Sequence, residues 1–125
     1  MGLPCARQED IVMGICYNHQ GTKIIPATYD ENGEELTPKK TEYFTQPETY
    51  IGLILDGAER TRINGLNMAQ ESNIVIGFCG HTGIIVTASN IVKAEGLGVA
   101  RQFDTVTGDG VIANIMSGSE NVFAG

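Results

Sequence analysis

Each of the two histidines in this chain closely follows a cysteine, and this spacing points to metal chemistry. Cys16 and His19 form a Cys-x-x-His pair, while Cys79 and His81 form a Cys-x-His pair. Two thiolates and two imidazoles match the closed tetrahedral set of a structural zinc site, and iron accepts the same donors. The competing interpretation is two buried thiols and two surface histidines with no ion between them. The sequence favours a metal site, with Zn2+ as the expected ion and iron as the alternative.

The metal interpretation depends on an internal repeat that places the two Cys/His pairs at equivalent positions. The segment GLPCARQEDIVMGIC begins at Gly2, GLNMAQESNIVIGFC begins at Gly65, and a shorter GLGVARQFDTVTG begins at Gly96. Shared glycine, alanine and β-branched positions at fixed offsets indicate repeated units that bury a common core. We therefore predict a single domain over 1–125, with repeat copies near 2–21, 57–83 and 88–125.

The elements that must position these residues are short strands. The chain has 16 glycines, which disfavour long helices because each costs about 1 kcal/mol relative to alanine. Alternation of apolar and polar residues over 111–116 is typical of a strand with one buried side. The predicted fold is all-β, a compact cone-shaped β-solenoid of short strands.

An insertion at 22–50 separates the first two copies. Its Asn32-Gly33 pair predicts a tight hairpin, since both central positions of such a turn accept a positive φ. The offset between the first two copies is about twice that between the last two, so the insertion could also stand in the place of a degenerate unit. The sequence leaves both interpretations open.

Composition excludes several classes of function. The formal net charge is −7 and the basic residues form no cluster, so no nucleic-acid partner is expected. There is no apolar stretch of about 18 residues, as a membrane span would need, and MGLPCARQED has no signal-peptide pattern. Three cysteines do not suit a disulfide framework, and Cys5, which has no histidine partner, is predicted to be a core residue.

The Cys/His pairs could also belong to an enzyme or to a metal sensor. A catalytic thiolate–imidazole pair could be drawn from Cys79 and His81, with Asp104 orienting the imidazole. The two residues lie on one short segment and no nucleotide or hydrolase motif accompanies them, so we expect that the protein is not an enzyme. A small Cys/His metal sensor is the other alternative, although the sequence offers no second exposed thiol pair.

The repeated segments resemble the PAAR-repeat family, whose members cap the spikes of contractile phage tails and type VI secretion systems. GLPCARQED (2–10), GLNMAQESN (65–73) and GLGVARQFD (96–104) are similar to the motif Gly-x-Pro-Ala-Ala-Arg-x-Gly-Asp, and ASNIVKAEG and GSENVFAG are similar to its preceding strand. The resemblance covers the chain except the insertion. It implies a cone that sharpens the tip of a trimeric central spike and pierces the target envelope. The spike would belong to a phage baseplate, which places the protein in the virion, or to a type VI secretion system, with which it would be secreted.

The resemblance also implies ligands and partners. Family members bind zinc or iron near the vertex through histidines and a cysteine, which correspond here to His19, Cys79 and His81, with Cys16 in place of a further histidine. The implied partner is a trimeric β-helical spike, with one copy of this chain per trimer and transient contact with the target cell membrane. The base of the cone must be apolar, and the candidate spike-binding residues, which could equally be ordinary core, are Ile112, Ile115, Met116, Val122 and Phe123.

Overall fold

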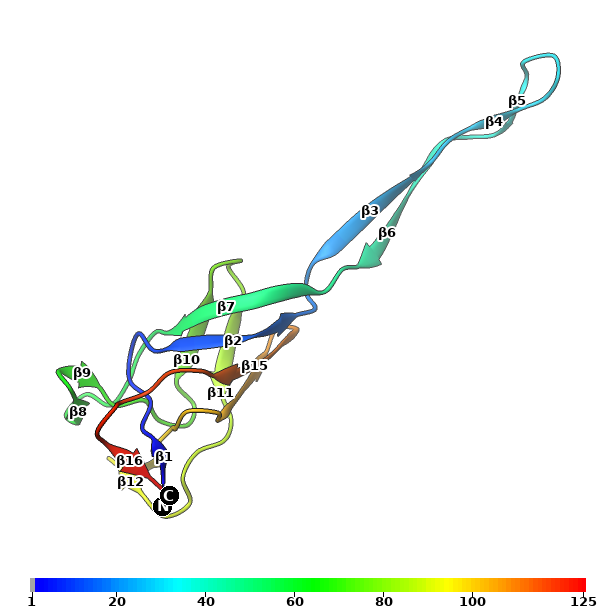
Figure 1. Ribbon diagram of the computed structural model, residues 1–125. Coiled ribbons are helices and arrows are strands. Elements are labelled where there is room, and N and C mark those ends of the chain that lie inside the picture. Colours follow the sequence, from blue (N-terminus) through cyan, green and yellow to red (C-terminus); the bar gives the residue numbers. More distant parts are fainter. Residues whose placement is uncertain (1) are drawn as a thin grey trace.

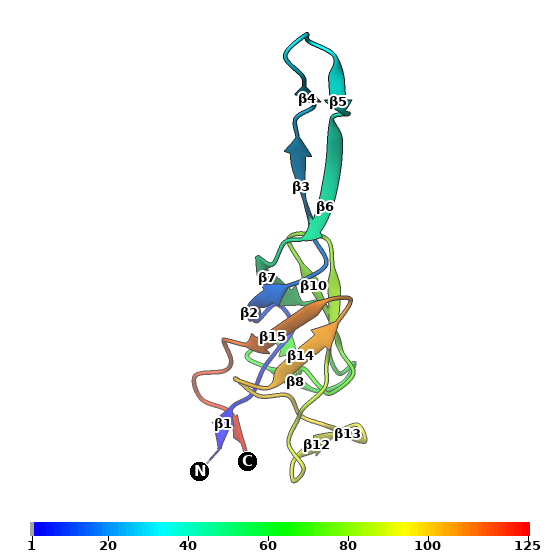
Figure 2. The same ribbon diagram turned by 90° about the vertical axis from the view of Figure 1, so that its right-hand side faces the viewer.

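The computed structural model describes residues 2–125, and all the regular structure within them is β-strand. Figures 1 and 2 show a small barrel with a long hairpin projecting from one end. The barrel strands are β2 (Ile11–Cys16), β7 (Glu48–Ile54), β10 (Ile74–Gly77), β11 (Thr82–Ile85), β14 (Thr105–Gly108) and β15 (Val111–Ile115). The projecting hairpin consists of β3 (Gln20–Ile25) with β6 (Lys40–Thr45) and β4 (Thr28–Tyr29) with β5 (Glu35–Thr37).

Three two-stranded ribbons complete the fold at the opposite end of the barrel, where both chain ends lie (Figure 1). They are β1 (Leu3–Pro4) with β16 (Phe123–Ala124), β8 (Arg62–Ile63) with β9 (Leu66–Asn67), and β12 (Lys93–Ala94) with β13 (Leu97–Gly98). Between residues 2 and 125 no helix is long and apolar enough to cross a membrane.

The predicted all-β class is confirmed, but the described strands close into a barrel where a cone-shaped solenoid was expected. Each repeat unit contributes one antiparallel pair: β2–β7, β10–β11 and β14–β15. These pairs then join edge to edge through β7–β10, β11–β14 and β15–β2. Wrapping the units around one axis pairs both edges of each of the six barrel strands, so the barrel itself has no open edge at which another chain could add a strand. Stacking them along an axis would leave two such edges.

The barrel core contains one side chain from the same position of each unit. Val12, Val75 and Val106 are equivalent in the repeat, and all are fully buried in the core cluster. Burial along β15 alternates strictly, as expected for a strand with one face inward. The β-branched positions that revealed the repeat are therefore the positions that fill the barrel.

A ring of backbone hydrogen bonds joins the three units at the axis. The N–H of Ala6 donates to the carbonyl of Ala100 (2.9 Å), the N–H of Ala100 to that of Ala69 (3.0 Å), and the N–H of Ala69 to that of Ala6 (3.0 Å). All three alanines are fully buried. A side chain larger than a methyl group would hold the three backbones apart, which explains why alanine recurs here. The molecule is thus close to threefold symmetric from one unbroken chain.

The three ribbons follow the same threefold pattern, and the chain ends take part in it. Two ribbons are closed by turns at Asn64-Gly65 and Glu95-Gly96, whose four residues all have positive φ, as a type I′ hairpin turn requires. In the third ribbon β1 pairs with β16, Leu3 opposite Ala124, and the two chain ends occupy the place of the turn. Figure 1 shows the termini side by side.

The insertion replaces one turn of the barrel and is not a fourth unit. β2 and β7 pair as the other two barrel hairpins do, but residues 17–47 connect them where β10–β11 and β14–β15 have short turns. The projecting strands begin at Gln20 and end at Thr45. Residues 48–50, which sequence analysis assigned to the insertion, belong to β7, and Tyr50 is fully buried in the barrel core.

The hairpin tip differs from the predicted two-residue Asn-Gly turn. The N–H of Gly33 donates to the carbonyl of Asp30 (3.1 Å), and the N–H of Asp30 donates to the carbonyl of Glu34 (2.8 Å). Within the tip, over residues 30–34, Gly33 alone has a positive φ, 81°. This is a three-residue loop in which glycine forms the bulge after a type I turn. The Asp30 carboxylate favours it by accepting the N–H groups of Asn32 and Glu34.

Candidate metal centre

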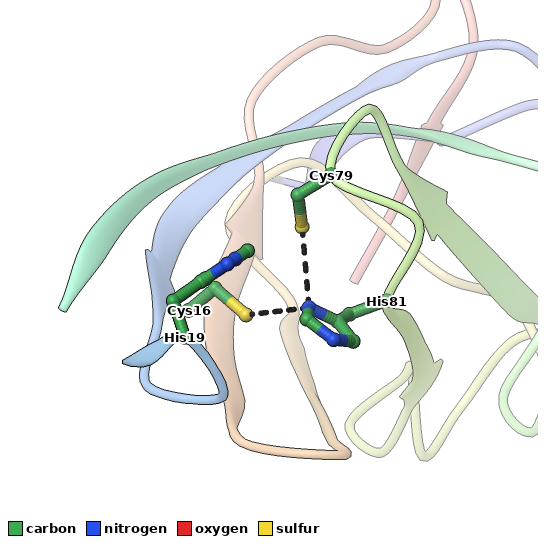
Figure 3. Close-up of side chains that lie close together, drawn as sticks. All are labelled: Cys16, His19, Cys79 and His81. Carbon is green, nitrogen blue, oxygen red and sulfur yellow. Dashed lines mark hydrogen bonds between the residues drawn. The ribbon is translucent and has the colours of Figure 1, made fainter. Parts of the chain in front are cut away.

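The four predicted ligands come together at the barrel end from which the hairpin projects (Figure 3). Cys16 is the last residue of β2, and His19 lies in the short segment that leads into β3. Cys79 and His81 lie in the turn between β10 and β11. Since β2 and β10 flank β7 in the barrel, the ends of these two strands are close in space. The repeat thus places the two Cys/His pairs on either side of one strand.

The turn that carries Cys79 and His81 has the same geometry as the hairpin tip. The N–H of Gly80 donates to the carbonyl of Gly77, and the N–H of Gly77 donates to the carbonyl of His81, each at 2.9 Å. Gly80 has a φ of 92°, a conformation that glycine adopts readily and most other residues do not. The single-residue spacing between Cys79 and His81 is therefore compatible with both side chains facing the cluster.

Distances within the cluster fit a tetrahedral ion. The Nδ1 atom of His81 lies 3.3 Å from Sγ of Cys16 and 3.5 Å from Sγ of Cys79, and one ligand atom of each residue lies within 4.8 Å of all the others. Zinc–sulfur and zinc–nitrogen bonds at a tetrahedral angle place sulfur and nitrogen about 3.6 Å apart. The four side chains could therefore hold a metal ion after small adjustments.

His19 provides an independent sign of an ion. Its Nε2 atom is buried and has no hydrogen-bond partner among the described residues, the single such side-chain atom found there. Buried polar atoms are nearly always paired, and an unpaired one calls for an explanation such as a missing ion. The His19 and His81 rings meet edge to face, with 4.8 Å between their centroids.

Burial makes the cluster costly to ionise without a cation. The Cys16 side chain is fully buried, and burial, with the neighbouring Cys79 thiol adding to it, raises the pKa of the Cys16 thiol. A metal ion would reverse this effect, because a coordinating thiol is deprotonated by the charge of the ion. Metal binding at this site would therefore release a proton from Cys16.

Two residues that sequence analysis did not single out support the cluster. Tyr50 of β7 donates its hydroxyl to the carbonyl of His81 (3.0 Å), and its ring fills the space that a side chain at Gly77 would occupy. Burial, followed by the nearby Cys79 and Cys16 thiols, raises the pKa of Tyr50 to about 12. Glu48 lies opposite Cys16 in the β2–β7 register, and its Oε2 atom is 3.6 Å from Nδ1 of His19. Only that strand register could have revealed either residue.

The third unit contributes structure but no ligand. Its turn carries Asp109 and Gly110, and the Gly110 carbonyl accepts the N–H of Tyr17 (2.7 Å). The side-chain amide of Asn18 donates to Asp109 (2.8 Å). This unit therefore fixes the 17–19 segment beside the cluster, so that a threefold framework holds a site with ligands from only two units.

The other residues that sequence analysis named lie elsewhere. Cys5 is buried in a second core cluster with residues of the ribbons. Asp104, considered as an orienting group for Cys79 and His81, is instead bound by Arg101 and Thr87.

The candidate spike-binding residues do not form one face. Ile115 is fully buried in the barrel core, whereas Ile112 on the same strand is 60% exposed. Met116 follows β15 and is exposed, Val122 is half-buried, and Phe123 is 54% exposed in β16. Ile115 therefore belongs to the core, and only Val122 and Phe123 lie at the ribbon end.

Comparison with known proteins adds no family to these observations. A scan against models of protein families found no match, and a search of curated proteins found none either.

Proposed function

We propose that this protein is a structural spike tip that caps the trimeric central spike of a contractile injection machine. The observation that carries the proposal is the threefold arrangement of three repeat units in one chain, joined by the ring of hydrogen bonds at Ala6, Ala69 and Ala100. A single chain of this symmetry can present equivalent surfaces to all three chains of a threefold partner. The similarity of its repeats to PAAR sequences supports the same assignment.

The ribbon end of the barrel is the expected docking surface. It carries three equivalent ribbons, one from each junction between units, and exposed apolar side chains there include Phe123, Ile91 and Leu97. Exposed apolar side chains of this kind are available for contact with a partner protein. The opposite end, with the Cys/His cluster, would face the target, and the projecting hairpin would enter the envelope ahead of the barrel (Figure 2).

Zinc is the ion that we propose for the cluster, with iron as the alternative. A closed set of two thiolates and two imidazoles is a structural zinc set and has no open position for a substrate. The role of the ion would be mechanical, since it would tie the β2 end to the β10–β11 turn at the end that meets the load. The contractile injection machine would be a phage baseplate or a type VI secretion spike, and its tip would contact the target membrane only transiently.

Docking is tested by mixing the protein with the trimeric β-helical spike protein from the same source and measuring stoichiometry by native mass spectrometry. One chain per spike trimer is expected. Phe123→Asp should weaken the complex, while Ile24→Asp, at a similarly exposed apolar residue on the hairpin, should not. A wild-type protein that fails to bind the spike would refute the spike-tip assignment, and would favour a metal sensor if it nevertheless binds zinc.

The metal is tested by elemental analysis of purified protein. Wild type should carry about one equivalent of zinc or iron. Both Cys16→Ser and Cys79→Ser should lose it, whereas Cys5→Ser, which alters the thiol outside the cluster, should retain it. Folded wild-type protein that takes up no metal would remove the ion from the proposal.

A further inference from the structure

The environment of His19 differs from that of His81 in a way that defines which nitrogen of each ring meets the ion. In His81 the Nδ1 atom faces both sulfurs, at 3.3 Å and 3.5 Å. In His19 the Nδ1 atom instead faces the Glu48 carboxylate, at 3.6 Å from Oε2. The remaining Nε2 of His19 is the buried atom without a partner. The two histidines therefore present different ring nitrogens to the cluster.

We propose that Glu48 is a positioning residue of the metal centre, which holds the Nδ1–H of His19 and leaves its Nε2 lone pair free for the ion. This inference rests on the proposed metal site and extends it to the second layer of residues. A neutral imidazole carries one proton, and the ring nitrogen that hydrogen-bonds to a neighbour determines which one keeps it. The Glu48 carboxylate is an acceptor beside Nδ1, with its Oε2 atom 3.6 Å away. Among residues 2–125, Nε2 has no hydrogen-bond partner.

The strand register explains why Glu48 is in this position. Glu48 is the first residue of β7 and lies opposite Cys16, the last residue of β2. His19 is three residues beyond Cys16, and the N–H of Gln46 donates to its carbonyl (2.8 Å), so the chain folds back over the start of β7. The Glu48 side chain is half-exposed, so it is free to rotate. A shift of a few tenths of an ångström would bring its Oε2 atom from 3.6 Å to hydrogen-bond distance of His19 Nδ1.

Such a carboxylate–histidine–metal arrangement orients the ring and increases the basicity of the ligand nitrogen. Loss of the outer partner typically lowers metal affinity by about 10- to 100-fold. Glu48→Ala should therefore weaken zinc binding by about that factor, measured by competition with a chromophoric chelator. Glu48→Gln, whose amide oxygen still accepts the Nδ1–H, should lose less. Glu42→Ala is the matched control, because Glu42 lies on the projecting hairpin, where it pairs with Lys40, and is not one of the cluster residues. This change should leave zinc affinity unchanged.

The tautomer of His19 provides a readout that a purely structural role would not alter. Nitrogen NMR of the metal-free protein at about pH 8, where an ordinary histidine is neutral, should show the proton of His19 on Nδ1. In Glu48→Ala that preference should be lost. Zinc affinity in folded Glu48→Ala equal to wild type, or a wild-type His19 protonated on Nε2, would overturn the proposal. Wild-type protein that binds no zinc would count against the metal centre itself, while the tautomer measurement would still decide whether Glu48 orients His19.

Discussion

Removal of the projecting hairpin is the most direct test of how this molecule is organised. The N–H of Gln46 donates to the carbonyl of His19, which is the bond that closes a four-residue turn. Residues 20–45 can therefore be replaced by Asn-Gly, so that His19, Asn, Gly and Gln46 form one tight turn. The variant retains all four cluster residues and Glu48. Its β2–β7 pair then resembles the other two barrel hairpins.

The expected change in stability follows from the exposure of the hairpin and the length of the loop. β6 is exposed along its entire length, and in β3 only Gly21 is buried, so little apolar contact is lost. An isolated two-stranded hairpin contributes almost nothing to stability in water. Shortening the connection from 26 residues to two halves the loop length between three and four times. Each halving lowers the entropic cost of closing the loop by about 0.6 kcal/mol. The barrel should thus be as stable as before or more stable by up to about 2 kcal/mol.

Denaturant unfolding of the metal-free protein measures this free energy, and a thermal scan should show a Tm increase of up to about 10 °C. A second variant, with a Gly/Ser segment of the original length in place of 20–45, separates loop length from hairpin structure. It should be about 2 kcal/mol less stable than the two-residue version. A decrease of more than about 1 kcal/mol in the two-residue variant, or loss of its zinc, would refute the view that the hairpin only replaces a turn.

Two further predictions concern buried polar groups. Arg101 binds the Asp104 carboxylate with two side-chain donors, so Arg101→Gln should lower the free energy of unfolding by about 2 kcal/mol. The equivalent residues of the second unit are the neutral Gln70 and Asn73. Adding Asp104→Asn recreates that neutral pair and should recover at least about 1 kcal/mol, whereas additive losses would contradict this coupling. The pKa of Tyr50 is raised to about 12 in the folded protein, so the unfolded state loses the phenol proton first as the pH rises. The stability that comes from keeping this proton is therefore complete below about pH 10 and is lost by about pH 12. Tyr50→Phe should remove that part of the pH dependence, and an unchanged alkaline unfolding curve would show that the phenol does not titrate as described.

The cluster could be predicted because its signal is local and duplicated. Two Cys/His pairs at equivalent repeat positions lie close together if neighbouring units pack in the same way. This holds whether the units stack along an axis or close around one. The choice between stacking and closure could not be made, because both bury the same positions of each unit. Glu48 could not be found for a related reason, since its role depends on the pairing register of β7 with β2.

For Ile115, sequence analysis left a core position and a spike-binding position open, and the strand period decides between them. Successive side chains of a strand point to opposite faces, so Ile112 and Ile115 cannot both lie outward on one regular strand. In β15 the buried positions are Val111, Ala113 and Ile115. The alternation of this strand in the sequence is therefore sufficient to separate its core residues from its surface residues.

The pairing of β1 with β16 bears on the order in which the molecule folds. Leu3 and Ala124 are neighbours in the ribbon but lie almost a full chain length apart in sequence, and contacts between such distant residues form slowly. The β10–β11 and β14–β15 hairpins are local and can form early. We therefore expect closure of the ring, through β15–β2 and β1–β16, to limit the folding rate. Joining the two ends by a short turn and opening the chain at Asn64-Gly65 would make that slow contact local, and would yield the same ring from a chain with a different first residue.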